Sequence, residues 1–157
     1  MTERTSEVAD AEDPPVAAWM DPILRADLVG TVALALVCLA AAVAPDAVTQ
    51  IALLAVSGLL FLGGIGAFAV GFLRLAGRSR YEVVDLGGVF YLTGSAPRVV
   101  RRWFLGLWFA QIVVAAGSAA FIHPPFGLLA PVWGIGLNPL WVSRHGTFPH
   151  RDVTPRA

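Results

Sequence analysis

The sequence has no lysine, a single cysteine and few charged residues of any kind. Charged side chains make up 14% of the 157 residues, whereas soluble domains average about 25%. Eleven basic residues balance eleven acidic ones, so no net field draws the chain to nucleic acid, and we expect no nucleic-acid partner. With Cys38 alone, the chain has no internal disulfide and no thiol pair for redox chemistry.

Apolar residues are what the sequence has in excess. They make up 57% of the chain, and a protein of this length has too small an interior to bury them all. Lipid is the solvent that accommodates such a composition, so the sequence predicts an integral membrane protein. Backbone groups in lipid must be paired within the chain, which favours helices and hence an all-α polytopic fold.

Four long apolar stretches follow an acidic start. Residues 1–20 carry five acids before two prolines, which is typical of a disordered tail. A helix needs about 20 residues to cross a bilayer core of roughly 30 Å. Pro131 and Pro139 lie in the fourth stretch, so a kinked span and a re-entrant loop both fit there. The sequence thus predicts a four-helix transmembrane domain over 21–143 and a C-terminal tail over 144–157, with spans at about 23–44, 51–73, 103–122 and 125–142.

The arginines predict which way the spans run. The loop between the second and third spans holds six of them, and three more follow the fourth span. The short loops after the first and third spans hold none. Basic residues in short loops mark the cytoplasmic side of a membrane protein. Because four spans put every arginine on one side, we expect both termini in the cytoplasm.

The segment 81–94, between the second and third spans, is too apolar for an ordinary loop and too short to cross the bilayer. A helix at the membrane interface fits, with Asp85 as its N-cap and Gly94 at its end. A hairpin that turns at Gly87-Gly88 also fits. The sequence favours the interfacial helix, because both caps are in place.

The third spanning helix is expected to start just after Ser95, its predicted N-cap, with Pro97 in the first turn. Arg98, Arg101 and Arg102 then share one helical face at the level of the lipid headgroups. We interpret this face as a topology anchor or as a binding patch for anionic headgroups or a partner. The topology anchor is the favoured interpretation.

Side chains able to carry chemistry within the membrane are scarce. Arg25 and Asp27 stand at the start of the first span, and no Asp, Glu, Arg or His lies near the middle of any span. Intramembrane charges mark ion paths and substrate sites, so this pattern argues against a single-chain pump or coupled transporter. His123, His145 and His150 are on different sides of the membrane or on the tail, which favours neither haem nor metal. We expect no enzyme, no catalytic residue, no cofactor and no metal site.

Small and polar residues within the spans predict how the helices pack. Gln111 and Asn138 are the polar side chains that are costly in lipid, and hydrogen bonds between helices are favoured over a ligand site. Stripes of small residues four apart let helix backbones approach closely. The stripe residues are Gly63, Ala67 and Gly71 in the second span and Ala130 and Gly134 in the fourth.

The tail motif RHGTFPHR gathers Arg144, His145, Phe148 and Arg151 within one short stretch. An aromatic ring among basic residues and prolines needs a surface to pack against. Docking of Phe148 on the loop residues 89–92 or on a partner is one hypothesis. Anchoring of the ring at the membrane interface is the other, and the sequence favours neither.

Three motifs carry a resemblance: LTGSAPRVVRR, FGLLAPVWGIGL and WVSRHGTFPHR. From about Gly63 onward, the chain resembles a family of small four-span actinobacterial integral membrane proteins of unknown function, whose C-terminal motif is W-x-x-R-H-G-T-F-P-x-R. Here Val142 and Ser143 replace a Gly-Ala pair, and His150 replaces a second proline. The resemblance covers a little over half the chain. It implies an actinobacterial plasma membrane and a four-helix layout, and it implies no activity.

These observations together predict a small multi-pass protein of the plasma (inner) membrane. We expect a non-enzymatic accessory or interaction subunit of a membrane assembly. An oligomeric transporter of small molecules or lipids, with a site formed between chains, is the alternative. The expected partners are the lipid bilayer, anionic lipid headgroups, and a membrane protein or a second copy of this chain.

Overall fold

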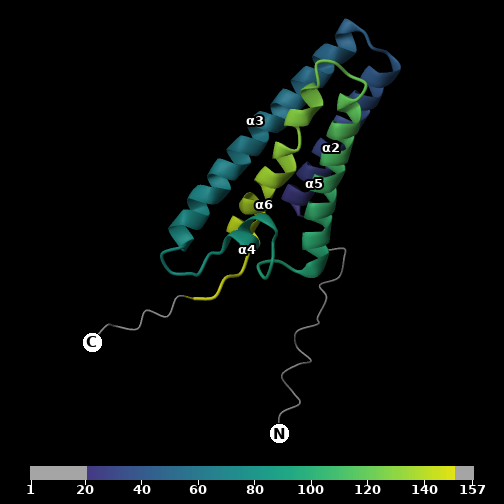
Figure 1. Cartoon of the computed structure of the whole chain (residues 1–157). Helices are drawn as coiled ribbons and strands as arrows, with labels where there is room; N and C mark the ends of the chain where they lie inside the picture. The colour runs from purple at the N-terminus through teal and green to yellow at the C-terminus, as the bar shows by residue number, and fades with distance from the viewer. Residues whose placement is uncertain (1–20, 151–157) are drawn as a thin grey trace, which may run out of the picture.

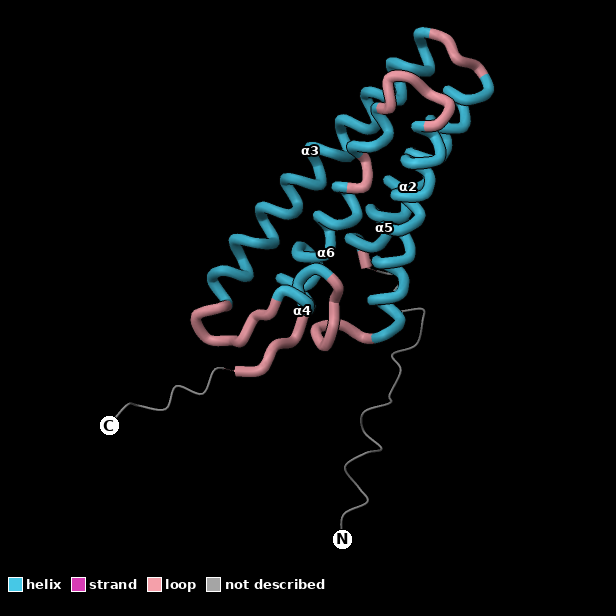
Figure 2. Tube along the Cα trace, viewed as in Figure 1, coloured by secondary structure: helices cyan, strands magenta, loops and turns pink. Residues whose placement is uncertain are grey.

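The computed structural model describes residues 21–150, in which four long helices pack side by side (Figure 1). The predicted tail 1–20 and Arg151 lie outside these residues. Helices and loops account for everything described, without a strand, as Figure 2 shows. The all-α fold is therefore confirmed. The elements are α2 (Pro22–Val43), α3 (Ala47–Arg78), α4 (Leu86–Phe90), α5 (Arg98–Ala119), the 3-10 turn η1 (Phe126–Leu129) and α6 (Val132–His145).

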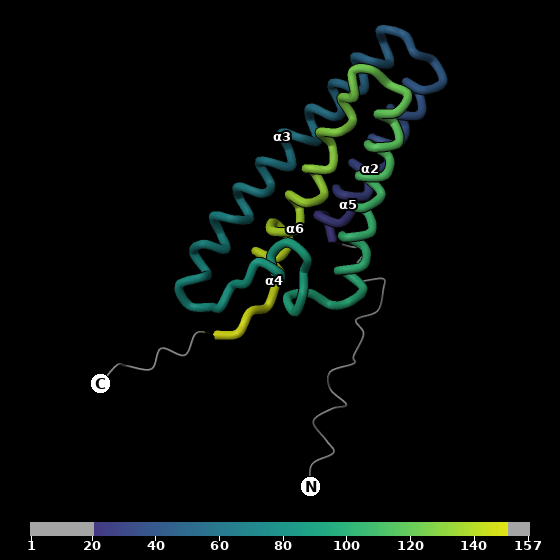
Figure 3. Tube along the Cα trace, in the orientation of Figure 1, coloured from purple at the N-terminus to yellow at the C-terminus, as the bar shows by residue number. Residues whose placement is uncertain are grey.

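Four segments are long and apolar enough to cross a membrane: α2, α3, α5, and η1 together with α6. They alternate in direction, so α3 ends, α5 begins and α6 ends at one end of the bundle (Figure 3). The start of α2 lies at the same end, because Asp21 is 3.6 Å from His145. We call this the arginine-rich end. Four spanning segments with both described chain ends at the same end of the bundle support a multi-pass membrane protein with an even number of spans.

Helix α3 extends beyond its predicted bounds at both ends. At its start, the Asp46 carboxylate accepts a hydrogen bond from the backbone N–H of Thr49 at 2.8 Å, and the Thr49 hydroxyl oxygen accepts one from Asp46 N–H. This capping box satisfies two of the free donors of the first turn. With 32 residues, α3 is about 48 Å long at the usual helical rise. It is the longest element of the bundle.

The expectation that Ser95 caps the third spanning helix is wrong. Pro97 takes the N-cap position of α5, and no side chain bonds to the first turn there. The Ser95 hydroxyl instead donates to the carbonyl oxygen of Gly88 at 2.6 Å. Ser95 thereby closes the preceding loop, and this tertiary bond replaces the local one that the sequence suggested.

The interfacial segment forms the helix alternative, and the hairpin at Gly87-Gly88 is wrong. Asp85 is the N-cap of α4, and its carboxylate accepts from Gly88 N–H at 2.7 Å. The helix stops after five residues, at Phe90, rather than running to Gly94. Two glycines within α4 weaken it, and Gly94 lies in the following turn with a φ of 73°.

The fourth stretch crosses the bundle completely, so the re-entrant alternative is wrong. It begins with the 3-10 turn η1, and α6 then runs to the arginine-rich end, with Pro139 inside the helix. The side chain of Arg78, at the end of α3, donates to the carbonyl oxygen of Val142. That contact places the ends of α3 and α6 side by side.

Helix α6 lies between α3 on one side and the α2–α5 pair on the other (Figure 1), and it contacts all three. Its approach to α3 is so close that a Cβ atom on Gly64 would overlap the main chain at Val132. Gly136 has the same relation to the main chain of Gly64. Neither residue belongs to the stripes that the sequence singled out.

The stripe residues themselves face several neighbours. Gly63 faces the Trp133 ring, and Gly71 faces the main chain of Pro139 and Leu140. Ala67 packs against the hydrophobic core, and Ala130 is fully buried. Gly134 faces α5, where it contacts Gln111 and Trp108.

Candidate functional site

Two places in the molecule bring functional groups together. One is a surface at the arginine-rich end, formed by the loop 79–97 and residues 146–150. The other is a group of polar side chains inside the bundle.

Arg78, the last residue of α3, holds three segments together. Its guanidinium donates to the carbonyl oxygens of Val142, Ser143 and Gly146 at 3.3, 3.4 and 2.9 Å. Val142 and Ser143 lie in the last turn of α6, where carbonyl oxygens lack some of their helical partners, and Val142 also accepts from Gly146 N–H at 2.9 Å. Arg78 Nε also donates to Glu82 Oε2 at 2.8 Å, so the side chain fixes the start of the loop as well. A planar group with five donors is suited to this role.

Phe148 packs against the loop. Its ring lies under the Arg78 guanidinium, 5.6 Å from the guanidinium carbon. It joins the hydrophobic cluster that includes the buried residues Val89 and Leu92. Of the two hypotheses for this ring, docking on the loop matches its position. A Cβ atom on Gly88 would meet the ring at 2.9 Å, so only glycine leaves room for it.

Backbone hydrogen bonds join the tail to the loop at two further points. Val83 N–H donates to the carbonyl oxygen of Pro149 at 2.9 Å, and Thr147 N–H donates to that of Ser95 at 3.2 Å. The loop and residues 146–150 therefore form one surface, which we call the clasp surface. Large apolar or aromatic side chains remain exposed on the loop part of it: Tyr81, Val83, Leu86 and Tyr91.

Two further predicted tail residues, Arg144 and His145, lie outside the clasp surface. Arg144 is exposed in the last turn of α6. His145 stacks on Trp141, with ring centres 5.3 Å apart, and its Nε2 lies 3.6 Å from Asp21 Oδ2. The same carboxylate oxygen accepts a hydrogen bond from the Trp141 indole. These contacts attach the start of α2 to the end of α6.

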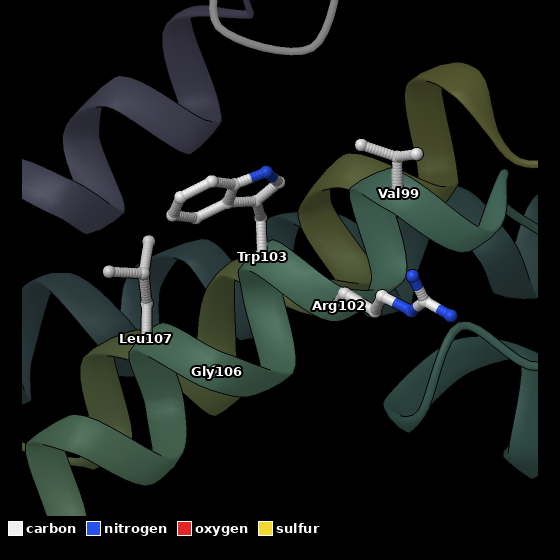
Figure 4. A pocket seen from close by; sticks show the side chains of 5 residues that line it. All are labelled: Val99, Arg102, Trp103, Gly106 and Leu107. Carbon is white, nitrogen blue, oxygen red and sulfur yellow. The ribbon is translucent and has the colours of Figure 1, made fainter. Parts of the chain in front are cut away.

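The predicted arginine face of α5 borders two open grooves. Figure 4 shows the first, of about 520 Å³, with Trp103 and Leu107 on one side and the Arg102 guanidinium on the other. Gly106 forms a notch in its floor, since nothing lies within 4 Å of the position of a Cβ atom there. The second groove, of about 580 Å³, is lined by Arg98, Arg101, Arg102, Leu105, Gly106 and Phe109. Each groove thus joins guanidinium groups to an apolar wall.

Inside the bundle, Gln111 connects three helices. Its Nε2 donates to Asp27 Oδ1 and to the Thr31 hydroxyl oxygen, both at 2.8 Å. Its Oε1 accepts from the backbone N–H of Gly134 on α6 at 3.1 Å. Asp27, Thr31 and Gln111 are all buried. We call these three side chains the polar centre. Asn138, the second costly amide, donates to the carbonyl oxygen of Phe90 at 2.8 Å and so ties α6 to α4.

Asp27 of the polar centre lies deeper in the bundle than its place near the start of α2 suggests. Trp133 faces Gly30 of α2 and Gly63 of α3, so these residues are level. Gly63 is at the midpoint of the long helix α3. Asp27 is three residues from Gly30, about 5 Å along the helix axis. An acidic side chain therefore lies close to half the height of the bundle.

No cluster of three or more His, Cys, Asp or Glu side chains that could hold a metal ion occurs within residues 21–150. Comparison of the chain with protein-family models, with curated proteins and with solved structures finds no match.

Proposed function

We propose that this chain is a non-enzymatic accessory subunit of a plasma-membrane assembly and that it binds its partner through the clasp surface. The observation that carries the proposal is the fixed arrangement of the loop 79–97, which Arg78, Asn138 and backbone bonds to residues 147–149 attach to the ends of the helices. Connections in compact proteins are commonly about 4–6 residues long, and longer ordered ones are usually functional. A surface ordered before binding loses less entropy when a partner docks.

The side chains exposed on the clasp surface support protein binding. Tyr81 and Leu86 are each 72% exposed, and Tyr91 is 52% exposed. Aromatic side chains are enriched at protein interfaces, because they offer large contact area with few rotatable bonds. The main-chain and ion-pair contacts beneath them hold the backbone that carries these side chains. A partner with a complementary apolar patch rimmed by polar groups fits this surface.

The proposed orientation puts the arginine-rich end in the cytoplasm. The excess of arginine at that end supports it. Arg98, Arg101 and Arg102 then lie at the inner leaflet, where guanidinium groups bind anionic phosphates in forked hydrogen bonds. We propose that the two grooves beside Gly106 receive anionic phospholipids, with the headgroup at the arginines and an acyl chain against Trp103 or Phe109. This lipid contact would set the height of α5 in the membrane.

Photo-crosslinking in native membranes tests the proposal. A photoreactive amino acid at Tyr91 should form a crosslink to one specific protein. The same probe at Phe121, which is 81% exposed at the opposite end, should give lipid adducts alone. Identical crosslinked proteins from both positions, or none from Tyr91, would contradict binding through the clasp surface.

The polar centre favours a second candidate function, an oligomeric transporter. A carboxylic acid inside a membrane bundle is a common feature of ion and substrate paths. Vesicles containing the purified chain alone would distinguish the two functions. A transporter dissipates a proton or solute gradient across such vesicles, whereas an accessory subunit without its partner leaves the gradient unchanged.

A further inference from the structure

The carboxyl group of Asp27 has one oxygen with a partner and one without. Gln111 donates to Oδ1 at 2.8 Å. Oδ2 is out of contact with solvent and has no hydrogen-bond partner among the described residues. The whole side chain is 0% exposed. A buried polar atom without a partner is costly, and a bare anionic oxygen is far more so.

The hydrogen bonds of the polar centre fix the orientation of the Gln111 amide. Gly134 N–H must face an acceptor, so it faces Oε1, and Nε2 is left to face Asp27. The Thr31 hydroxyl donates to the backbone oxygen of Asp27 at 2.8 Å, so its oxygen is free to accept the second Nε2 hydrogen. Every donor of this network is used, and none is left for Asp27 Oδ2. Because Oδ2 has no partner at all, burial costs less when it is the O–H of a neutral carboxyl than when it is the bare oxygen of a carboxylate.

Compensating charges are distant from Asp27 on every helix packed around it. On α5, Arg102 is nine residues from Gln111, and on α6, Arg144 is ten residues from Gly134, which are axial distances of about 14 and 15 Å. On α3, Arg74 is eleven residues from Gly63, and Asp27 lies about 5 Å nearer the arginine-rich end than Gly63, so the axial distance from Arg74 to Asp27 is about 12 Å. The remaining charged and titratable groups of these helices lie farther toward the arginine-rich end: Arg98, Arg101, Arg78 and His145.

The groups on the helix of Asp27 itself do not neutralise it either. Arg25 is two residues away, which is about 200° around the helix, so it emerges on another side. Asp21 is a further acid at the helix start, where it bonds to Trp141. The two ion pairs seen among residues 21–150, Arg78–Glu82 and His145–Asp21, do not include Asp27.

We propose that the Asp27 carboxyl is an intramembrane proton-binding site. It holds a proton on Oδ2 while α2, α5 and α6 are packed together. When the contact between α2 and Gln111 opens, the proton passes to a water molecule and leaves a carboxylate that needs hydration. The polar centre thus couples a proton to the packing of three helices. This inference goes beyond the accessory function and does not depend on it.

Infrared spectroscopy of the whole chain in lipid vesicles at neutral pH tests the proposal. A protonated carboxyl has a C=O stretching band well separated from the bands of carboxylates. The wild type should show this band and Asp27→Asn should lack it, while Asp46→Asn, which removes an exposed carboxylate, should keep it. Labelling all aspartates with carbon-13 should shift the band, which assigns it to an aspartate rather than a glutamate even if a variant fails to fold.

Exchange and titration complete the test. In heavy water the band should move to lower frequency, because the bound proton exchanges with solvent, and it should disappear as the pH is raised. Spectra of the wild type and Asp27→Asn that are identical in this region would overturn the proposal. A band that keeps its frequency after long exposure to heavy water would overturn it as well, since the proton would then be trapped rather than bound reversibly.

Discussion

The guanidinium carbon of Arg78 lies 5.6 Å from the centre of the Phe148 ring, although one residue ends α3 and the other follows α6. A cation at this distance is attracted by the face of an aromatic ring. The same guanidinium bonds to three carbonyl oxygens at the end of α6. This one side chain therefore joins the loop after α3 to the tail after α6.

Replacing Arg78 should loosen the clasp surface and leave the bundle intact. In Arg78→Ala, amide hydrogens in residues 81–97 and 146–150 should exchange about 10- to 100-fold faster, since charged hydrogen bonds contribute roughly 1.5–3 kcal/mol. Arg78→Lys should behave similarly, because an ammonium group lacks the planar fork. Hydrogen exchange read by mass spectrometry measures this. The control is Arg74→Ala, which removes an exposed arginine one turn earlier. Equal exchange rates in Arg78→Ala and Arg74→Ala would mean that Arg78 does not hold the clasp surface in place.

The close approach of α3 and α6 predicts a sharp difference between glycines of one helix. Gly64→Ala should destabilise the bundle by about 1–3 kcal/mol, because the new methyl group meets the main chain of α6. Gly66→Ala should be neutral or slightly stabilising, since nothing lies within 4 Å of its Cβ position and alanine favours the helix. Thermal unfolding in detergent compares the two. Similar melting temperatures would mean that the helices are not in backbone contact.

The proposed orientation predicts which positions are accessible from outside the cell. With Cys38 replaced by serine, single cysteines are placed at Ala47 and at Thr93, which are exposed at opposite ends of the bundle. An impermeant thiol reagent added to intact cells should label position 47 and spare position 93. The reverse result would contradict the orientation. Labelling of both positions would contradict an even number of spans.

The start of α3 should respond to acid. Hydrogen bonds from Thr49 hold the pKa of the exposed Asp46 carboxyl below its usual value. A lowered pKa in the folded state means that the cap stabilises the helix above the ordinary aspartate pKa and is lost as the pH falls through the lowered value. Protection factors in residues 47–50, the intrinsic exchange rate at each pH divided by the observed one, should therefore fall on acidification, and Asp46→Ala should show the low values at every pH. A flat profile in the wild type would show that the cap contributes nothing.

The helices were predictable from the sequence because lipid solvation is a simple constraint. Uncharged stretches of about 20 residues leave few alternatives to a spanning helix. Asp85 also capped the interfacial helix as expected, since that bond is local. The prediction that Ser95 is an N-cap was wrong because a tertiary contact replaces the local one. The Ser95 hydroxyl bonds to Gly88, seven residues away.

The depth of Asp27 was not predictable, because it depends on how far one helix slides past another. Asp27 is only five residues into α2, which suggests a position near the membrane surface. Gln111, its partner, is thirteen residues into α5, so α5 starts about 12 Å before α2 at the arginine-rich end. The Trp141 indole donates to Asp21 and so ties the start of α2 to α6. The ion pair of Arg78 with Glu82 differs, because its i, i+4 spacing is visible in the sequence. The hydrogen bonds from Arg78 to carbonyl oxygens at the end of α6 are not visible there, because those residues are far along the chain.

The central proposal is that a protein partner binds at the clasp surface. The most direct measurement is the amount of partner that copurifies with the intact chain from native membranes, with Leu86→Ala and Tyr91→Ala compared against Phe121→Ala. Both loop variants remove exposed side chains and leave the contacts of Arg78 in place. The amount of copurified partner should fall at least 10-fold in the two loop variants and stay unchanged in Phe121→Ala. The same proteins recovered in the same amounts from all three would contradict it.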